Sequence, residues 1–172
     1  RVRGNRAGLR SITLDTAEAI EARVIPFAGA VAGGFLLAPP ELPVLPAPHL
    51  FRQIGCFLLQ GARAMDRWGD VTHRLGQERP IFPHWYLAVL GVEPVAHGQG
   101  LGGRLLDSIF EIISARPAPL YLECDRLASV EFYLQRGFVI RSEHSVNGVQ
   151  TWCLGAGFAD GSPDLCDPVR QG

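Results

Sequence analysis

The sequence has little charge of either sign and no long apolar run, and each shortage excludes a class of protein. Its 16 Lys and Arg residues nearly balance 17 Asp and Glu residues, so a net charge of -1 leaves no broad basic surface for nucleic acid. No stretch approaches the ~20 apolar residues that cross a bilayer, and no signal peptide is visible. We therefore expect neither nucleic acid nor a membrane as a partner, and we expect a cytoplasmic location.

Cysteines are also few, and their spacing gives no metal site. None belongs to a CxxC pair or has a histidine at metal-ligand distance; the four are Cys56, Cys124, Cys153 and Cys166. We interpret them as reduced thiols that fill the core of a cytoplasmic protein, and we expect no metal.

The 172 residues are 47% apolar and 19% charged, which suits one globular domain with a sizeable core. Their hydrophobic periodicity predicts an α/β protein. Gly29 and Gly33-Gly34 are typical of turns or bulges, and Asn147-Gly148 predicts a hairpin. Five prolines in 39–48 indicate a stiff extended connection. The predicted strands are 11–16, 24–37, 84–92, 120–124, 138–143 and 150–154, and the predicted helices are 50–75, 101–115 and 128–136.

Residues 84–103 organise the rest of the chain. Residues 84–92 are apolar or aromatic after His84, as in a strand buried on both faces, and Pro94 ends that strand. Four of the six residues from Gly98 to Gly103 are glycine, and a helical apolar period follows at once. A glycine-rich turn that opens a helix presents unpaired N–H groups to an anion, so it predicts a phosphate site. Alternatively, the glycines only shape a tight connection.

Three phosphate-binding motifs compete for this turn. A P-loop needs Lys and then Ser or Thr after its last glycine, but Arg104 follows Gly103. Gly98, Gly100 and Gly103 satisfy G-x-G-x-x-G, with Glu123 at the distance of a ribose-binding acid. Five residues separate the strand from the first glycine, however, so a Rossmann oxidoreductase is the weaker alternative. The third candidate ligand is acyl-coenzyme A.

The run from Val92 to Gly102 resembles the pyrophosphate motif of the GNAT acyltransferases, in which Gln or Arg precedes two small residues. Gly100 and Gly102 match the small positions, and His97 stands where Gln or Arg is usual. Residues 131–138 resemble a second hallmark, a Phe-Tyr pair whose Tyr133 lies four residues ahead of Gly-Phe. Over residues 84–154 the chain is similar to the puromycin N-acetyltransferase group, although Ser129 replaces the usual Asn.

This resemblance implies a GNAT fold over residues 1–155, with a mixed sheet and a parallel pair at the coenzyme site, followed by an irregular tail at 156–172. A further strand and helices would precede Arg1, so we expect the domain to be N-terminally incomplete. The resemblance also implies acetyl-coenzyme A as the acyl donor. The residues expected to bind it are Leu90, Gly91, Val92, His97, Gly98, Gln99, Gly100, Leu101, Gly102, Gly103, Arg104, Ser129 and Tyr133.

We predict an N-acetyltransferase that acts on a small-molecule amine in a ternary complex, as a monomer or homodimer. Tyr133 is the expected general acid, because the pKa of a phenol lies within about two units of that of a thiol. Glu123 is the expected general base, directly or through water, although it could equally pair with Arg126 or solvate the cleft rim. His84 is discounted, since it lies about 23 Å from Gly91 along an extended strand. A non-catalytic acyl-coenzyme A sensor is the alternative from another class.

Overall fold

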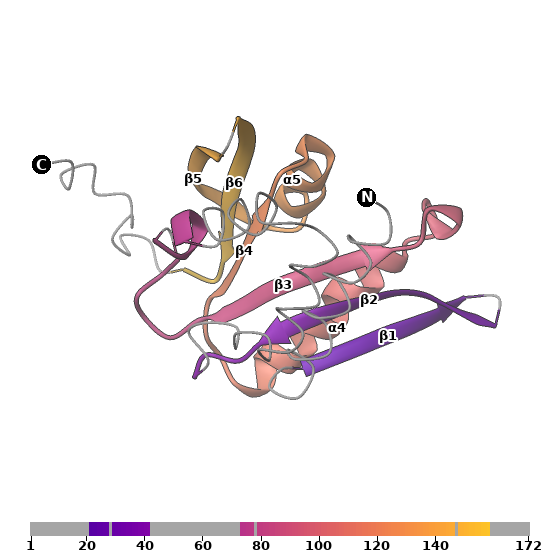
Figure 1. Cartoon of the computed structure of the whole chain (residues 1–172). Coiled ribbons are helices and arrows are strands. Elements are labelled where there is room, and N and C mark those ends of the chain that lie inside the picture. The colour runs from indigo at the N-terminus through magenta and orange to yellow at the C-terminus, as the bar shows by residue number, and fades with distance from the viewer. Residues whose placement is uncertain (1–20, 28, 42–72, 78, 147, 159–172) are drawn as a thin grey trace, which may run out of the picture.

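The computed structural model describes residues 21–27, 29–41, 73–77, 79–146 and 148–158. In this part of the chain six strands form one sheet in the order β1-β2-β3-β4-β6-β5, and helix α4 packs against β2 and β3 (Figure 1). The predicted α/β class is confirmed. The elements are β1 (Glu21–Phe27), β2 (Ala30–Ala38), β3 (Trp85–Val92), η1 (Pro94–Ala96), α4 (Leu101–Ala115), β4 (Leu120–Cys124), α5 (Leu127–Leu134), β5 (Val139–Val146) and β6 (Val149–Ala156).

The predicted strand 24–37 is in fact an antiparallel hairpin of β1 and β2. Phe27 pairs with Ala30, and Gly29 reverses the chain with a φ of +80°, which a side chain would disfavour. Residues 21–23, which lie outside the predicted strand, also belong to β1. The prediction joined the two strands because apolar residues continue on both sides of Gly29. The predicted strand 11–16 and most of the predicted helix 50–75 lie outside the described residues; residues 73–77 are helical.

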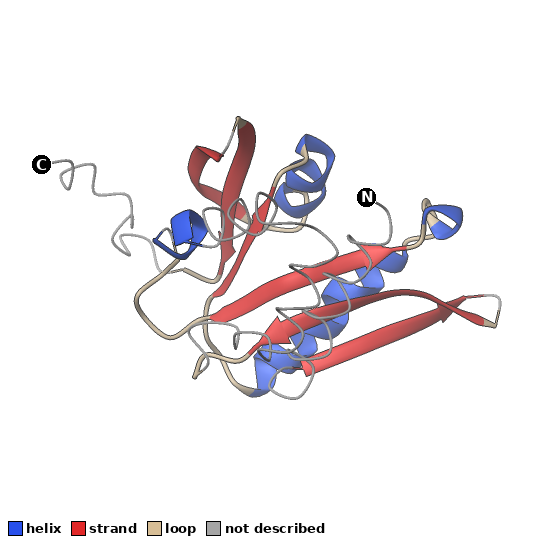
Figure 2. Cartoon of the chain, in the orientation of Figure 1, coloured by secondary structure: helices blue, strands red, loops and turns tan. Residues whose placement is uncertain are grey.

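Strands β3 and β4 form the predicted parallel pair, but only at one end. Their paired residues are Trp85 with Leu120 and Tyr86 with Tyr121, whereas β3 continues to Val92 along β2 on its other side (Figure 2). Beyond Tyr86 the two strands therefore separate, and the edge of β3 that faces β4 has no strand partner among the described residues. The parallel pair expected from the resemblance is confirmed, and one edge of β3 is open beyond it.

A bulge in β3 sets which side chains face the core. Leu36 pairs with Val89 and Leu37 with Leu87, so Ala88 is an extra residue in β3. Trp85 and Leu87 are buried, but beyond the bulge Val89 is 43% exposed. The prediction that this strand is buried on both faces is therefore wrong for its second half, where Leu90 and Val92 pack against the core and Val89 and Gly91 are exposed.

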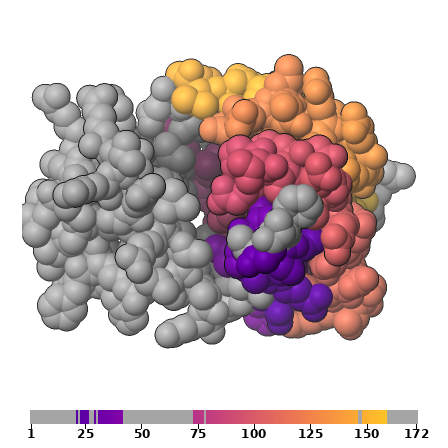
Figure 3. Space-filling model, turned by 90° about the vertical axis from the view of Figure 1, so that its right-hand side faces the viewer, coloured from indigo at the N-terminus to yellow at the C-terminus, as the bar shows by residue number. Residues whose placement is uncertain are grey.

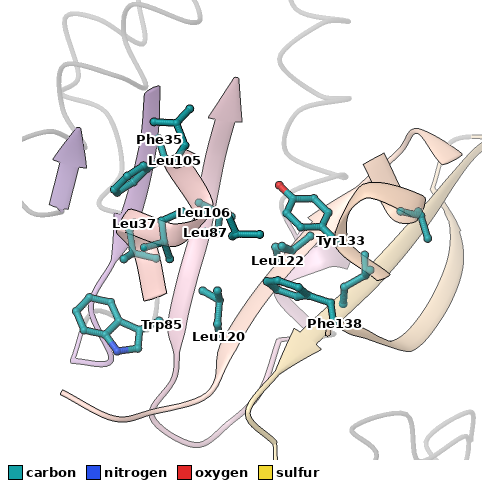
Figure 4. Close-up of a cluster of buried hydrophobic side chains, with 13 residues drawn as sticks. Phe35, Leu37, Trp85, Leu87, Leu105, Leu106, Leu120, Leu122, Tyr133 and Phe138 are labelled. Atoms are coloured by element: carbon teal, nitrogen blue, oxygen red, sulfur yellow. The ribbon is translucent and has the colours of Figure 1, made fainter. Parts of the chain in front are cut away.

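The main core lies between the sheet and helices α4 and α5 (Figure 4). Leu101, Leu105, Leu106 and Ile109 of the predicted helical period are all buried. Burying each such side chain contributes about 1.5–3 kcal/mol, which fixes α4, and with it the preceding turn, on the sheet. The C-terminal hairpin across residues 147–148 is confirmed, with Gly148 at a φ of +79°. No helix in the described part is long and apolar enough to span a membrane.

Candidate active site

Residues His97–Gly103, called the glycine turn below, join η1 to the first turn of α4. Gly98 and Gly100 have φ values of +76° and +71°, and Gly100 caps α4 without any side-chain hydrogen bond. Residues 97–100 are exposed, and no atom lies within 4 Å of where a Cβ on Gly98 or Gly100 would be. The first amides of α4 are therefore open to an anion, as the predicted phosphate site requires.

Gly102 and Gly103 have a second role that the sequence pattern did not indicate. A Cβ on Gly102 would lie 3.3 Å from Cε2 of Phe132, and one on Gly103 would lie 3.3 Å from Nη2 of Arg136. Both partners belong to α5 or the residues just after it. The two glycines thus allow α5 to pack directly against the first turn of α4.

His97 makes a contact within the chain rather than pointing freely into the turn. Its Nε2 lies 2.8 Å from the carbonyl oxygen of Val92, so Nε2 carries the proton and donates it. This bond ties η1 back to the end of β3. Contact between His97 and a phosphate stays a prediction, and with this nitrogen occupied only Nδ1 would be available for it.

The open edge of β3 ends beside the glycine turn. Gly91 is exposed, and no atom lies within 4 Å of where its Cβ would be, whereas Leu90 and Val92 pack partly against the core. Figure 3 shows this end of the molecule, where the pink residues around η1 lie between the indigo β1–β2 hairpin and the orange segment that contains α5. The two coenzyme-binding elements expected from the sequence are therefore adjacent.

Tyr133 is buried in α5 and has an unused hydroxyl. The residue is 7% exposed, and its ring packs 5.1 Å from both Phe132 and Phe138, measured between centroids. Figure 4 shows the hydroxyl directed away from Phe138, toward the side of the cluster where β3 lies. Among the described residues it has no hydrogen-bond partner, and leaving a buried hydroxyl unpaired costs about 1–3 kcal/mol. Such a group is a candidate for contact with a ligand.

Burial, and secondarily the neighbouring Cys124, raises the pKa of the Tyr133 phenol. The phenol therefore stays protonated at neutral pH and is available as a donor. The raised pKa widens the difference between this phenol and a free thiol. A thiolate released into the same buried site would also be a stronger base than in water, because the same desolvation acts on it.

Glu123 lies in a closed network with Arg79 and Tyr86, called the carboxylate network below. Arg79 Nε donates to Glu123 Oε1 at 3.0 Å and Arg79 Nη2 to the Tyr86 oxygen at 2.7 Å. The Tyr86 hydroxyl donates to Glu123 Oε2 at 2.7 Å. The Glu123 side chain is 7% exposed, so the two alternatives of pairing with Arg126 and of solvating the rim are both wrong.

Electrostatics favour the charged pair in this network. Burial is the largest single influence and would lower the pKa of Arg79, but the charge and hydrogen bond of Glu123, together with the nearby Tyr86 and Tyr121, outweigh it and the pKa is raised. Burial, together with Glu123, raises the pKa of the Tyr86 phenol. Tyr86 is the last β3 residue paired with β4, so its bond to Glu123 bridges the strands where they begin to separate. Sequence reasoning missed Arg79 and Tyr86, since Arg79 is 44 positions from Glu123 and belongs to no recognisable motif.

The remaining predicted site residues occupy the expected places without side-chain contacts that define a role. Ser129 is half-buried in the first turn of α5, where its N–H donates to Arg126 O at 2.9 Å, and Arg104 is exposed in the first turn of α4. His84 is buried with Nδ1 2.8 Å from Phe82 O, and burial lowers its pKa. It precedes β3, at the end away from the glycine turn, as expected.

Comparison with known proteins agrees with this geometry. Residues 71–138 match the model of the Acetyltransferase (GNAT) family. The fold resembles the histone acetyltransferase HPA2 and related acetyltransferase from Corynebacterium glutamicum, with 20% identity, a TM-score of 0.60, and coverage of 89% of this chain and 73% of that one. It also resembles Arabidopsis thaliana Naa50 in complex with a bisubstrate analogue, with 15% identity, a TM-score of 0.55, and coverage of 86% of this chain and 80% of that one. A third similar structure is nourseothricin acetyltransferase, with 14% identity, a TM-score of 0.52, and coverage of 81% of this chain and 66% of that one.

Proposed function

We propose that this chain is a GNAT-type, acyl-coenzyme A-dependent N-acetyltransferase, because residues 71–138 match the model of that family and the fold resembles solved acetyltransferases, and that it acetylates the amine of a small molecule. Within the family we place it in the puromycin N-acetyltransferase-like group, because of the similarity over residues 85–91 and 151–153. The amine would attack directly in a ternary complex, as expected from the sequence.

The observation that supports this chemistry best is the buried hydroxyl of Tyr133, which has no hydrogen-bond partner among the described residues. It is accompanied there by an uncapped helix start and an open strand edge. These three features fit acyl-coenzyme A. Open amides suit its diphosphate, an unpaired strand edge suits its pantetheine amides, and a buried phenol suits its sulfur. A dinucleotide would use the turn but would leave the strand edge and the phenol without a role.

When bound, acetyl-coenzyme A supplies an activated thioester. The protein then needs to orient the amine, donate one proton to the leaving sulfur and accept one from the amine nitrogen. We propose that the Tyr133 O–H donates to the sulfur as the C–S bond breaks. Glu123 would accept, directly or through water, the proton that the amine nitrogen loses as the N–C bond forms. Two of the roughly four lone-pair sites of its carboxylate are used by Arg79 and Tyr86, which leaves capacity for one more donor.

The experiment is an amine screen with acetyl-coenzyme A as donor, in which free thiol is followed with time and products are identified by mass. One arm contains small primary amines, and the other contains peptides with free N-terminal or lysine amines. We expect a small amine to be acetylated with a kcat/KM at least about tenfold above any peptide, equal to about 1.4 kcal/mol in the barrier. A preference for peptides would contradict the small-molecule assignment. Coenzyme binding without thiol release in either arm would support the sensor alternative.

A further inference from the structure

Arg136 follows α5, and its side chain folds back toward the first turn of α4. The guanidinium carbon lies 3.8 Å from the centroid of the Phe132 ring, and Nη1 donates to the Phe132 carbonyl oxygen at 2.9 Å. Its Nη2 lies 3.3 Å from the position that a Cβ on Gly103 would occupy. Stacking and hydrogen bonding together hold this exposed cation in one place beside the glycine turn.

No carboxylate balances this cation within the described part of the chain. Arg136 forms no ion pair there, and the first turn of α4 contains no acidic residue. Arg104 adds a second positive charge to that turn, and the helix dipole adds a third positive element. An anion bound at this helix start would be attracted by these positive groups.

The amides of the glycine turn and the Arg136 guanidinium offer two different kinds of anion contact. The amides surround the helix axis, whereas Arg136 lies to the side of α4, where Gly103 leaves room for it. The Nε and Nη2 donors of this planar guanidinium have no hydrogen-bond acceptor among the described residues. They suit a terminal phosphate, which can accept two parallel hydrogen bonds. Coenzyme A contains such a group, the 3′-phosphate on its ribose, in addition to its diphosphate.

We infer that Arg136 binds the ribose 3′-phosphate of coenzyme A and so distinguishes it from coenzymes that lack this group. The inference rests on the proposed function, since it assumes that the diphosphate lies on the glycine turn. Phe132 is then a positioning residue for the cation. A side chain at Gly103 would crowd the Arg136 guanidinium.

The test is direct binding, by titration calorimetry, of coenzyme A and of 3′-dephospho-coenzyme A to the wild type and to Arg136→Gln. We expect the wild type to bind coenzyme A about tenfold more tightly than the dephospho form, as one charge-assisted contact would give. In R136Q this ratio should fall to within about twofold, while affinity for the dephospho form stays the same. The matched control is Arg141→Gln, which removes a cation stacked on Phe158 from β5 and should leave the ratio unchanged.

Three results would overturn the inference. Equal losses for both ligands in R136Q would mean that Arg136 contacts the diphosphate or only supports the turn. An unchanged ratio in R136Q, or a wild type that does not distinguish the ligands, would remove the 3′-phosphate contact. Binding of neither ligand by the folded wild type would instead refute the proposed function itself. Affinity for dephospho-coenzyme A reports the integrity of the turn, so a misfolded R136Q would be recognised by its loss of this affinity. In that case Arg136→Lys, which keeps the charge, is the second variant, and it should retain part of the preference for coenzyme A over the dephospho form.

Discussion

The glycine turn and the carboxylate network differ in how their residues are distributed along the chain. The turn occupies consecutive positions from His97 to Gly103, and its binding groups are backbone amides at a helix start. The network joins Arg79, Tyr86 and Glu123, with up to 44 positions between partners, through side chains only. A contiguous site depends on local backbone geometry, whereas a dispersed site depends on the packed fold. The two regions should therefore fail in different ways when single residues are changed.

Removing the cation from the network should produce the largest effect, and the effect should be on stability. In Arg79→Met the buried Glu123 carboxylate loses its charge partner, and breaking such a pair costs about 3–5 kcal/mol. The free energy of unfolding, measured by urea denaturation, should fall by that amount. The double variant Arg79→Met with Glu123→Gln should recover part of the loss, because no uncompensated charge remains buried. A decrease below about 1 kcal/mol would show that the pair is solvated and that the network does not depend on packing.

Removing the phenol of Tyr133 should lower turnover without comparable loss of stability. Tyr133→Phe keeps the ring against Phe132 and Phe138 but removes the proposed proton donor, so we expect kcat to fall about 10²-fold or more. The Kd for coenzyme A should stay the same. Since the lost hydroxyl is buried without a partner, the variant should be as stable as the wild type or more so. An unchanged kcat would exclude Tyr133 as the general acid.

Sequence reasoning succeeds for features that a short stretch of chain determines. Tyr133 was predicted because its motif, from Phe132 to Phe138, lies within one helix and the turn after it, where spacing fixes position. The apolar period of α4 likewise predicted which leucines are buried. The parallel pairing of β3 with β4 also follows from the strand, helix, strand order and agrees with the resemblance. In each case the information is local or depends on one crossover.

The sequence could not indicate features that depend on long-range register. Arg79 lies outside any periodic segment, so its bond to Glu123 follows only from the folded chain. The bulge at Ala88 has no glycine or proline to mark it, and it changes which side chains of β3 face the core. Gly29 was recognised as a turn or bulge residue, but the apolar residues around it concealed that two strands meet there. Contacts between α5 and the glycine turn were missed for the same reason.

A substitution in the glycine turn should affect ligand binding more than folding. In Gly100→Ala there is room for the new methyl group, but alanine disfavours a φ of +71° by about 1–2 kcal/mol. We expect the turn to move, so that the amides of α4 lose their orientation and the Kd for coenzyme A rises about tenfold by calorimetry. Gly76→Ala is the matched control, since Gly76 has equal room and lies in the helical segment 73–77. Equal affinity in the wild type and G100A would show that the turn does not need this backbone conformation.

The smallest effect concerns His84, on the same face of the sheet as the network. Its ring packs edge-on against Tyr121 with centroids 5.7 Å apart, and burial lowers its pKa below the ordinary 6.5. The unfolded chain thus binds a proton at this residue that the folded chain does not, so stability should fall as the pH drops below about 6.5. Between pH 7 and pH 5.5 the contribution of His84 to this loss is at most about 1.3 kcal/mol, the limit for a histidine that binds no proton in the folded state. His84→Asn, whose amide could still donate to Phe82 O, should show a shallower acid decline in urea unfolding, and an identical decline would mean that His84 titrates as in water.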